Sequence, residues 1–294
     1  MKSPFRWILS LVQPINLLLA GLAYLLGLSV ARYLGISINS VTAILGGSFT
    51  IFALASSNLL NAYFASPFRS SPANESQHEQ DAMKRWLLYV SFGLLAVSVI
   101  LVFYLFRFDS LKVPVGIFII LDFLVALVIS IPPFRLADRG FGELGLALLL
   151  TAFPIITAFL LQSNNLHRLV SFLTFPLVFL ALAYFLVLDF PIYSSDQKCG
   201  RQSLLVRLTW QRAIPLHDIL VLVSYLLFAA APLFGIPYVL VWSPLLTLPL
   251  AIYQIFVLRN ITIGLKPNWT ILIITATTLV GLNIYLLMLT FWLR

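Results

Sequence analysis

The sequence predicts an all-α integral membrane protein with about nine transmembrane helices. Hydrophobic residues make up 61% of the chain and charged residues only 10%, and the mean hydropathy is +1.02. A water-soluble domain carries a larger charged fraction on its surface, so this composition excludes one. Lipid offers no hydrogen-bond partner to the backbone, and a helix of roughly 20 apolar residues is the usual segment that spans it.

Nine apolar stretches are long enough to cross a membrane. The first follows a short basic start and lacks a small-residue cleavage site, so we interpret it as a retained helix. Pro132-Pro133 ends the fourth stretch, and Gly235-Ile236-Pro237 separates the seventh from the eighth, which as one segment would exceed any bilayer. The predicted spans are Trp7–Val30, Val41–Tyr63, Trp86–Phe106, Val113–Pro132, Leu144–Leu161, Leu169–Leu188, Ile214–Phe234, Val239–Leu258 and Trp269–Leu293.

The distribution of basic residues predicts the orientation. With nine spans, all of the 18 Lys and Arg residues except Arg32, Arg107, Lys112, Arg168 and Arg294 fall on one side. Because Lys and Arg are enriched in cytoplasmic loops, the N-terminus is expected in the cytoplasm and the C-terminus on the opposite side of a prokaryotic-type inner or cytoplasmic membrane. The charges sit at helix ends and form no continuous basic face, so membrane lipids rather than nucleic acid are the expected partners.

The domain prediction is a single polytopic membrane domain over residues 1–294. Its two long polar loops, residues 65–85 and 190–213, both fall on the predicted cytoplasmic side and lie four helices apart. This spacing suggests two related halves that each contribute one loop to the cap of a shared site.

Four segments carry a recognisable pattern of polar residues, Gly and Pro. They are Gln13–Gly21, Asn58–Phe64, Ser130–Leu144 and Gly200–Leu208. In this order, and with nine spans, they resemble the UbiA superfamily of intramembrane prenyltransferases, most closely its menaquinone-type branch. The resemblance implies a UbiA-type bundle with a central lipid-facing cavity. It also implies a reaction in which Mg²⁺ on two Asp-rich loops holds the diphosphate of a polyprenyl donor.

The residues at the family's metal positions differ from that pattern. The first loop's Asn-x3-Asp-x3-Asp pattern falls on Asn61, Ala65 and Arg69, and the second loop's acidic pair falls on Ile192 and Asp196. Asp196 is therefore the only principal ligand retained. An aliphatic side chain offers a metal no lone pair, and Arg repels a divalent cation. Mg²⁺ is expected if the protein is catalytically active, and otherwise no cofactor.

The polar residues of these loops are the expected substrate-binding residues, because amide and basic side chains can contact a polar or anionic headgroup. They are Asn58, Asn61, Arg69, Asp189, Asp196, Lys198 and Arg201. Glu75, Glu79 and Asp81 are interpreted as solvated loop residues rather than substitute ligands. The Gly140–Glu143 segment is interpreted as a turn, and no catalytic residue is assigned.

Asp122 is a further candidate, since an ionisable residue in the middle of a span is costly and usually faces a cavity or a partner. A ligand site, a subunit contact and a carboxyl group bonded to a neighbouring helix remain open for it.

Three functions are open for the chain as a whole. We favour a non-catalytic or altered UbiA-like protein that binds an isoprenoid lipid, quinone or prenylated pigment, as part of a larger membrane complex. The alternative is a divergent active prenyltransferase that transfers a polyprenyl chain to an aromatic or tetrapyrrole-like acceptor. A transporter is the least supported reading, because Asp122 alone is clearly charged and intramembrane.

Overall fold

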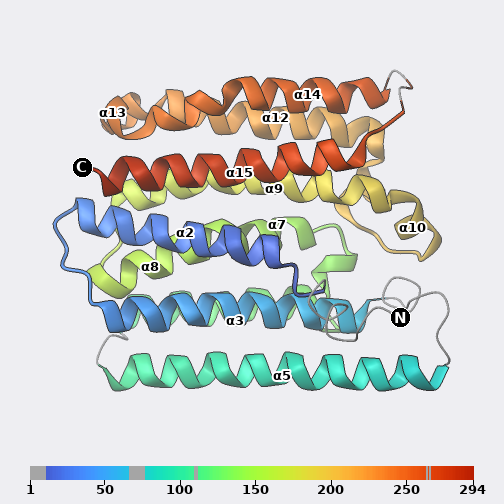
Figure 1. Cartoon of the computed structure of the whole chain (residues 1–294), viewed down its shortest axis with the longest axis horizontal. Coiled ribbons are helices and arrows are strands. Elements are labelled where there is room, and N and C mark those ends of the chain that lie inside the picture. The colour runs from blue at the N-terminus through green and yellow to red at the C-terminus, as the bar shows by residue number, and fades with distance from the viewer. Residues whose placement is uncertain (1–10, 66–76, 109–111, 263, 265) are drawn as a thin grey trace.

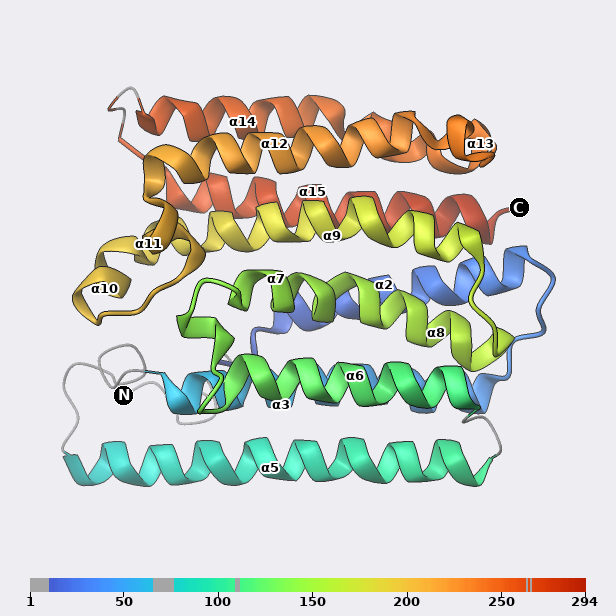
Figure 2. The ribbon, with the colours of Figure 1, turned by 180° about the vertical axis from the view of Figure 1, so that it is seen from behind.

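The computed structural model describes residues 11–65, 77–108, 112–262, 264 and 266–294, and the side chains of residues 77–82 are not described. Within these ranges, nine helices are long and apolar enough to cross a membrane, which confirms the predicted all-helical fold. They run nearly parallel in stacked rows (Figures 1 and 2). They are α2 (Pro14–Tyr33), α3 (Ser40–Phe64), α5 (Gln77–Arg107), α6 (Val113–Ser130), the segment Gly142–Ser163, the segment Arg168–Lys198, α12 (Trp210–Ala229), the segment Ser243–Thr262 and α15 (Trp269–Trp292).

Three of these spans are made of several elements. The fifth contains α7 (Gly142–Ala147), the π-turn η2 (Leu148–Ala152) and α8 (Phe153–Ser163); the sixth contains α9 (Arg168–Asp189), η3 (Phe190–Ile192) and α10 (Tyr193–Lys198); the eighth contains η5 (Ser243–Thr247) and α14 (Leu248–Thr262). The shorter elements η1 (Leu136–Asp138), α11 (Leu204–Leu208), η4 (Ala231–Phe234) and α13 (Tyr238–Val241) connect spans.

The centre of the bundle is formed by α2, α8, α9 and α15. Their buried side chains are mostly Leu, Ala, Val, Ile and Phe, and they form one continuous core. Gly27 on α2 faces α8 so closely that a Cβ there would overlap the Ile155 carbonyl oxygen and Ala158 Cβ. Small residues of this kind let membrane helices approach each other in the absence of a hydrophobic driving force between them.

Apart from the sixth span, which was expected to end at Leu188 and continues to Lys198, three boundaries differ from the sequence prediction by four residues or more. A helix was expected to run from Trp7 through Val30, but α2 begins at Pro14, and Gln13 before it has a left-handed backbone with φ 56°. Pro has no backbone N–H and is favoured in the first turn of a helix, which explains the start. Trp7 itself lies outside the described residues.

The other two differences concern the segment between α12 and α14 and the first polar loop. Compared with the expected span Ile214–Phe234, α12 begins four residues earlier and ends five residues earlier. The segment Ser243–Thr262 begins and ends four residues later than the expected span Val239–Leu258. Pro232, Gly235 and Pro237 break the chain between them into η4 and α13. The predicted loop 65–85 is already helical from Gln77, where α5 begins.

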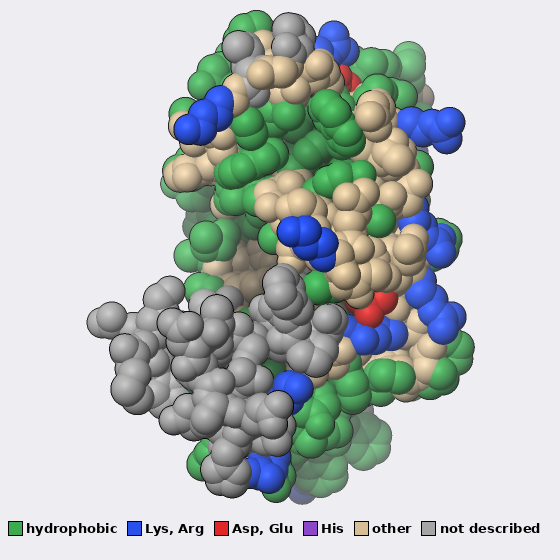
Figure 3. Space-filling view, turned by 90° about the vertical axis from the view of Figure 1, so that its right-hand side faces the viewer, with side chains coloured by type: hydrophobic (Ala, Val, Ile, Leu, Met, Phe, Trp, Pro, Cys, Tyr) green, Lys and Arg blue, Asp and Glu red, His purple; other side chains and the backbone are tan. Residues whose placement is uncertain are grey.

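The two ends of the bundle differ in composition. The end that carries α10 and the C-terminal end of α14 is shown in Figure 3, where Lys and Arg side chains are spread over the face and few acidic groups are visible. Segment 190–213, one of the two loops predicted to cap a site, lies at this end (Figures 1 and 2).

Candidate functional site

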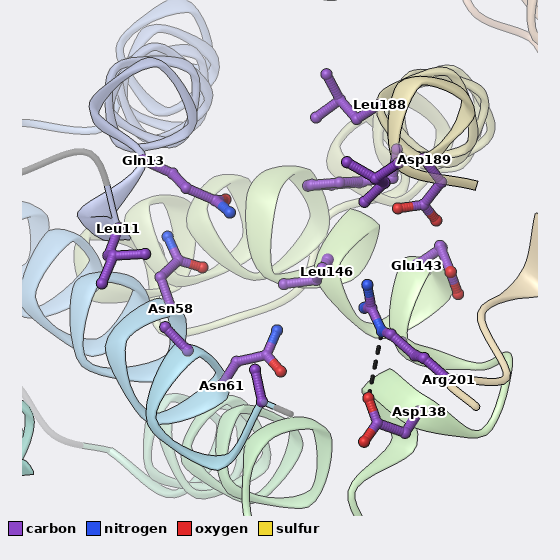
Figure 4. A pocket seen from close by; sticks show the side chains of 15 residues that line it. Leu11, Gln13, Asn58, Asn61, Asp138, Glu143, Leu146, Leu188, Asp189 and Arg201 are labelled. Atoms are coloured by element: carbon purple, nitrogen blue, oxygen red, sulfur yellow. Dashed lines mark ion pairs between the residues drawn. The ribbon is translucent and has the colours of Figure 1, made fainter. Parts of the chain in front are cut away.

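A cavity of about 290 Å³ opens at this end of the bundle, between α2, α3, α7 and α9. Figure 4 shows the side chains that line it. We call this space the polar cavity. Its polar lining residues are Gln13, Asn58, Asn61, Asp138, Glu143, Asp189 and Arg201. Apolar side chains, among them Leu146, Phe185 and Leu188, complete the wall toward the membrane.

The α2 and α3 side of the polar cavity presents amides whose orientation is fixed. Tyr184 on α9 donates a hydrogen bond from its hydroxyl to Asn16 Oδ1 over 2.7 Å, and Asn16 Nδ2 donates to Gln13 Oε1 over 2.6 Å. Tyr184 and Asn16 are 3% and 4% exposed, so this relay is shielded from water. It leaves the Nε2 donor of Gln13 directed at the cavity (Figure 4).

Asn58 contributes to the same side. Its Nδ2 donates to the backbone carbonyl of Val12 over 3.0 Å, and its Oδ1 is left toward the cavity (Figure 4). Asn61 lies one helical turn further along α3, with its amide directed into the same space. This side therefore offers both hydrogen-bond donors and acceptors and carries no charge.

The opposite side of the cavity carries carboxylates. Glu143, at the start of α7, is 3% exposed. Its Oε1 accepts a hydrogen bond from the backbone N–H of Leu204 over 3.0 Å, and within the described residues its buried Oε2 has no hydrogen-bond partner. Asp189, at the end of α9, is 8% exposed and lies next to Glu143 in Figure 4.

Arg201 joins the loops at the mouth of the cavity. Its Nη1 lies 3.1 Å from Asp196 Oδ2, and its Nε lies 3.2 Å from Asp138 Oδ1. Nε also donates to the carbonyl oxygen of Ala137 over 3.2 Å, and Arg135 Nε pairs with the other oxygen of Asp138 at 2.9 Å. The guanidinium group is thus shared between two carboxylates, so it is less available to an anionic ligand than a solvated Arg would be.

The structure places the residues predicted from sequence as follows. Asn58, Asn61, Asp189 and Arg201 line the polar cavity together. Asp196 lies beside it, in a smaller cavity of about 170 Å³ that shares Arg201 and Asp138. The side chain of Lys198 is exposed and lines neither cavity. Arg69 and Glu75 lie outside the described residues, as do the side chains of Glu79 and Asp81.

Asp122 lies apart from this site. It is 4% exposed within α6 and lines neither the polar cavity, nor the smaller cavity beside it, nor the apolar groove between α2 and α3. Its burial inside this chain leaves little surface for contact with another subunit.

Sequence reasoning missed three residues of the polar cavity. Gln13 was placed inside a continuous helix, although Pro14 signalled a helix start. Glu143 was assigned to a turn and Asp138 was given no role, but Asp138 lies in η1, Glu143 lies in α7, and both line the cavity. The signal that could have identified Glu143 was its carboxylate at the beginning of an apolar span, where an unpartnered charge is costly.

The donor set does not fit a Mg²⁺ site of the kind that the family resemblance implies. Ala65 and Ile192, at two expected ligand positions, both line the polar cavity, and aliphatic side chains cannot coordinate a cation. Both oxygens of Asp138 pair with guanidinium groups. Within the described ranges, no group of three or more His, Cys, Asp or Glu side chains is arranged to hold a metal ion.

A second, apolar groove of about 770 Å³ runs between α2 and α3 at the outer surface of the bundle, where Leu18 and Ile44 are exposed. On α3 it is lined by Ile44, Gly47 and Ile51, and the same helical stripe continues to Asn58 at the polar cavity. On α2 the stripe from Leu28 to Leu17 leads back to Gln13. Residues three, four and seven apart share one face of a helix, so the two spaces lie along the same seam.

These features define an integral membrane protein with a polar site at one end and an apolar groove beside it. The sequence matches no protein-family model and no curated protein. Its structure has a UbiA-like fold. A UbiA homologue from Archaeoglobus fulgidus is 17% identical, with a TM-score of 0.63, and the match covers 97% of this chain and 99% of that one.

Two further solved structures match over nearly the whole chain. The Archaeoglobus fulgidus homologue bound to DMAPP and Mg²⁺ is 17% identical, with a TM-score of 0.60 and coverage of 95% of this chain and 98% of that one. A structure of digeranylgeranylglyceryl phosphate synthase is 15% identical, with a TM-score of 0.61 and coverage of 99% and 98%. At these identities the likeness concerns the fold.

Proposed function

We propose that this protein belongs to the prenyltransferase-like UbiA proteins and binds an isoprenoid lipid with an uncharged, quinone-type headgroup, without ionising a prenyl diphosphate. The observation that carries this proposal is that Ala65 and Ile192 line the polar cavity. At these positions the resemblance places the carboxylates that would hold Mg²⁺, and a diphosphate leaving group needs such cations to neutralise its charge.

The charges that face the cavity also support an uncharged headgroup. Asp138, Glu143 and Asp189 line it, whereas Arg201 is the one basic residue among the described lining residues. A diphosphate placed among these carboxylates would be repelled, because like charges at short range in a partly buried site interact strongly. The amides of Gln13, Asn58 and Asn61 can instead bond carbonyl or hydroxyl groups.

The apolar groove supports an isoprenoid tail as its occupant. It begins one helical turn beyond Gln13, at Leu17, and follows α2 and α3 into the membrane-spanning part of the bundle. A ligand whose headgroup occupies the polar cavity would therefore lead its tail along this seam. Burial of each methylene contributes about 0.8 kcal/mol relative to water, although lipid competes for the same contact.

The end of the bundle that carries the polar cavity is assigned to the cytoplasm. Lys and Arg side chains are spread over this end (Figure 3), and positive residues favour the cytoplasmic side. The N-terminus would then be cytoplasmic and the C-terminus on the other side. Association with further subunits of a membrane complex is part of the same proposal, and the apolar outer faces of α5 and α14 are free for it.

A divergent active prenyltransferase is the second candidate. The observation that favours it is that Glu143 and Asp189 lie together in the polar cavity, which supplies carboxylate oxygens that the motif positions lack. The UbiA homologue bound to DMAPP and Mg²⁺ shows that a protein of this fold can hold DMAPP together with Mg²⁺. In this candidate function, Glu143 and Asp189 would replace the carboxylates that are missing at Ala65 and Ile192.

One experiment separates the two candidates. The protein is purified in mild detergent, its bound lipids are identified by mass spectrometry, and binding of geranyl diphosphate is then measured by calorimetry with and without Mg²⁺. Co-purification of a quinone-type lipid, with no Mg²⁺-dependent binding of the diphosphate, is expected. Release of diphosphate from geranyl diphosphate on addition of Mg²⁺ and an aromatic acceptor would refute the proposal in favour of the second candidate.

A further inference from the structure

The polar cavity has one buried acceptor that nothing in the described part of the chain satisfies. Glu143 is 3% exposed, its Oε1 is held by the N–H of Leu204, and its Oε2 has no hydrogen-bond partner among the described residues. A buried carboxylate oxygen without a donor costs more than an ordinary unmade hydrogen bond, because the lost hydration is not replaced. Among the described residues, Glu143 Oε2 is therefore an acceptor that a ligand's donor can satisfy.

The other side of the cavity has the complementary feature. The relay from Tyr184 through Asn16 holds Gln13 Oε1, so the Nε2 of Gln13 is the group left to bond a ligand. Nε2 can only donate. Gln13 and Glu143 lie on opposite sides of the same cavity in Figure 4, so a ligand between them meets a donor on one side and an acceptor on the other.

We propose that Glu143 and Gln13 select a hydroxylated headgroup, namely the quinol form of an isoprenoid quinone over its oxidised form. A ring hydroxyl donates to Glu143 Oε2, and an oxygen on the other side of the ring accepts from Gln13 Nε2. The oxidised ring has only carbonyl acceptors, and a carbonyl placed against Glu143 Oε2 would add repulsion between two lone-pair-bearing oxygens. This inference rests on the proposed function, since it names the redox form that the same site binds.

Arg201 does not offset the acceptor character of Glu143. Its guanidinium group is engaged by Asp138 and Asp196, whereas Glu143 Oε2 has no hydrogen-bond partner among the described residues. This side of the cavity therefore favours a ligand that brings a donor.

The test compares three ligands on the full-length protein in detergent under anaerobic conditions. They are a naphthoquinone with one isoprene unit, its quinol, and the quinol's dimethyl ether, which has no hydroxyl donor. A hydrogen bond to a charged acceptor corresponds to about tenfold in affinity or more. The quinol is expected to bind at least about tenfold more tightly than either other ligand.

Glu143→Gln is the decisive variant. Its Oε1 can still accept from Leu204, while its amide nitrogen replaces the free acceptor with a donor. We expect the preference to reverse, so that the quinone binds more tightly than the quinol. Asp122→Asn is the matched control, because it neutralises another buried carboxyl group that does not line the polar cavity, and it should keep the wild-type preference.

The results distinguish failure of the selection by Glu143 from failure of the proposed function. Equal binding of quinone, quinol and ether to the wild type would refute the selection by Glu143 while leaving the proposed function in place. Such a result would indicate that a buried water satisfies Oε2. Absence of binding by all three ligands to protein that unfolds cooperatively would refute both proposals. The comparison of quinone, quinol and ether on the wild-type protein tests the preference for the quinol by itself. The test therefore does not depend on whether Glu143→Gln folds.

Discussion

Arg201 and Asp138 form an ion pair, with Nε 3.2 Å from Oδ1, that ties the loop before α11 to the turn after α6 at the mouth of the polar cavity. The same guanidinium holds Asp196, which is 2% exposed. One side chain thus fixes two loops that approach the cavity from different parts of the chain. The contact therefore fixes the loops at the mouth of the cavity, whereas Gln13 and Asn58 are held by their own hydrogen bonds.

Replacement of Arg201 should therefore destabilise the loops. In Arg201→Met, Asp196 and Asp138 lose the shared guanidinium, and loss of one partner of a buried ion pair costs about 3 kcal/mol. We expect a lower unfolding temperature and faster proteolysis between α10 and α11. Arg201→Lys should recover part of the stability, since Lys keeps the charge without the forked geometry. Lys198→Met, at an exposed neighbouring position, is the control and should unfold like the wild type.

Tyr184→Phe tests the relay that orients Gln13. Without the hydroxyl, the buried Asn16 Oδ1 loses its donor, which should lower the free energy of unfolding by about 1 kcal/mol. The amide of Gln13 also loses its fixed orientation, so binding of the isoprenoid ligand should weaken about fivefold.

The matched control for Tyr184→Phe is Tyr225→Phe. Tyr225 bonds Thr247 and Asn283 in a separate buried cluster, so it should cost similar stability but leave ligand affinity unchanged. Thermal unfolding and calorimetric titration on the same preparations measure both effects. Equal loss of affinity in the two variants would contradict an orienting role for Tyr184.

Gly21→Leu tests the groove between α2 and α3. A Cβ at Gly21 would meet no atom within 4 Å, so the leucine fits the fold and extends into the groove. It displaces roughly two methylenes of a bound tail, and affinity for a long-tailed ligand should fall about tenfold. A ligand that has the headgroup and no tail should bind as before.

Gly93→Leu on α5 is the control for this change. A Cβ there also meets no atom within 4 Å, and the residue lies outside the groove. Both substitutions replace a helical glycine, so both should raise helix stability by a similar amount. An equal fall in affinity for both variants would exclude the groove as the place of the tail.

Introducing carboxylates at the metal positions tests the comparison with the family. The combined change Ala65→Asp, Arg69→Asp and Ile192→Asp should produce Mg²⁺-dependent binding of geranyl diphosphate, because hard cations prefer carboxylate oxygens. Calorimetry measures the binding. Asn at the same three positions is the matched control, since it has similar size without the charge. A folded Asp variant without Mg²⁺-dependent binding would show that these positions are wrongly aligned with the family.

The sequence by itself determined the membrane class, the nine helices and the loops that would meet at one end. Long apolar stretches are decisive because lipid forces the backbone to bond within each helix. Asn58, Asn61, Asp189 and Arg201 could also be assigned to one site, because each stands at or near the end of an apolar stretch and belongs to a recognisable segment.

Only the tertiary structure decided which partners these residues have. Arg201 was expected to face a ligand, yet it is shared between Asp138 and Asp196. Gln13 lines the site because the helix starts at Pro14, and Glu143 lines it because α7 packs against α9. Hydrogen bonds and ion pairs between residues far apart in the chain depend on the packing of whole helices, which local sequence patterns do not specify.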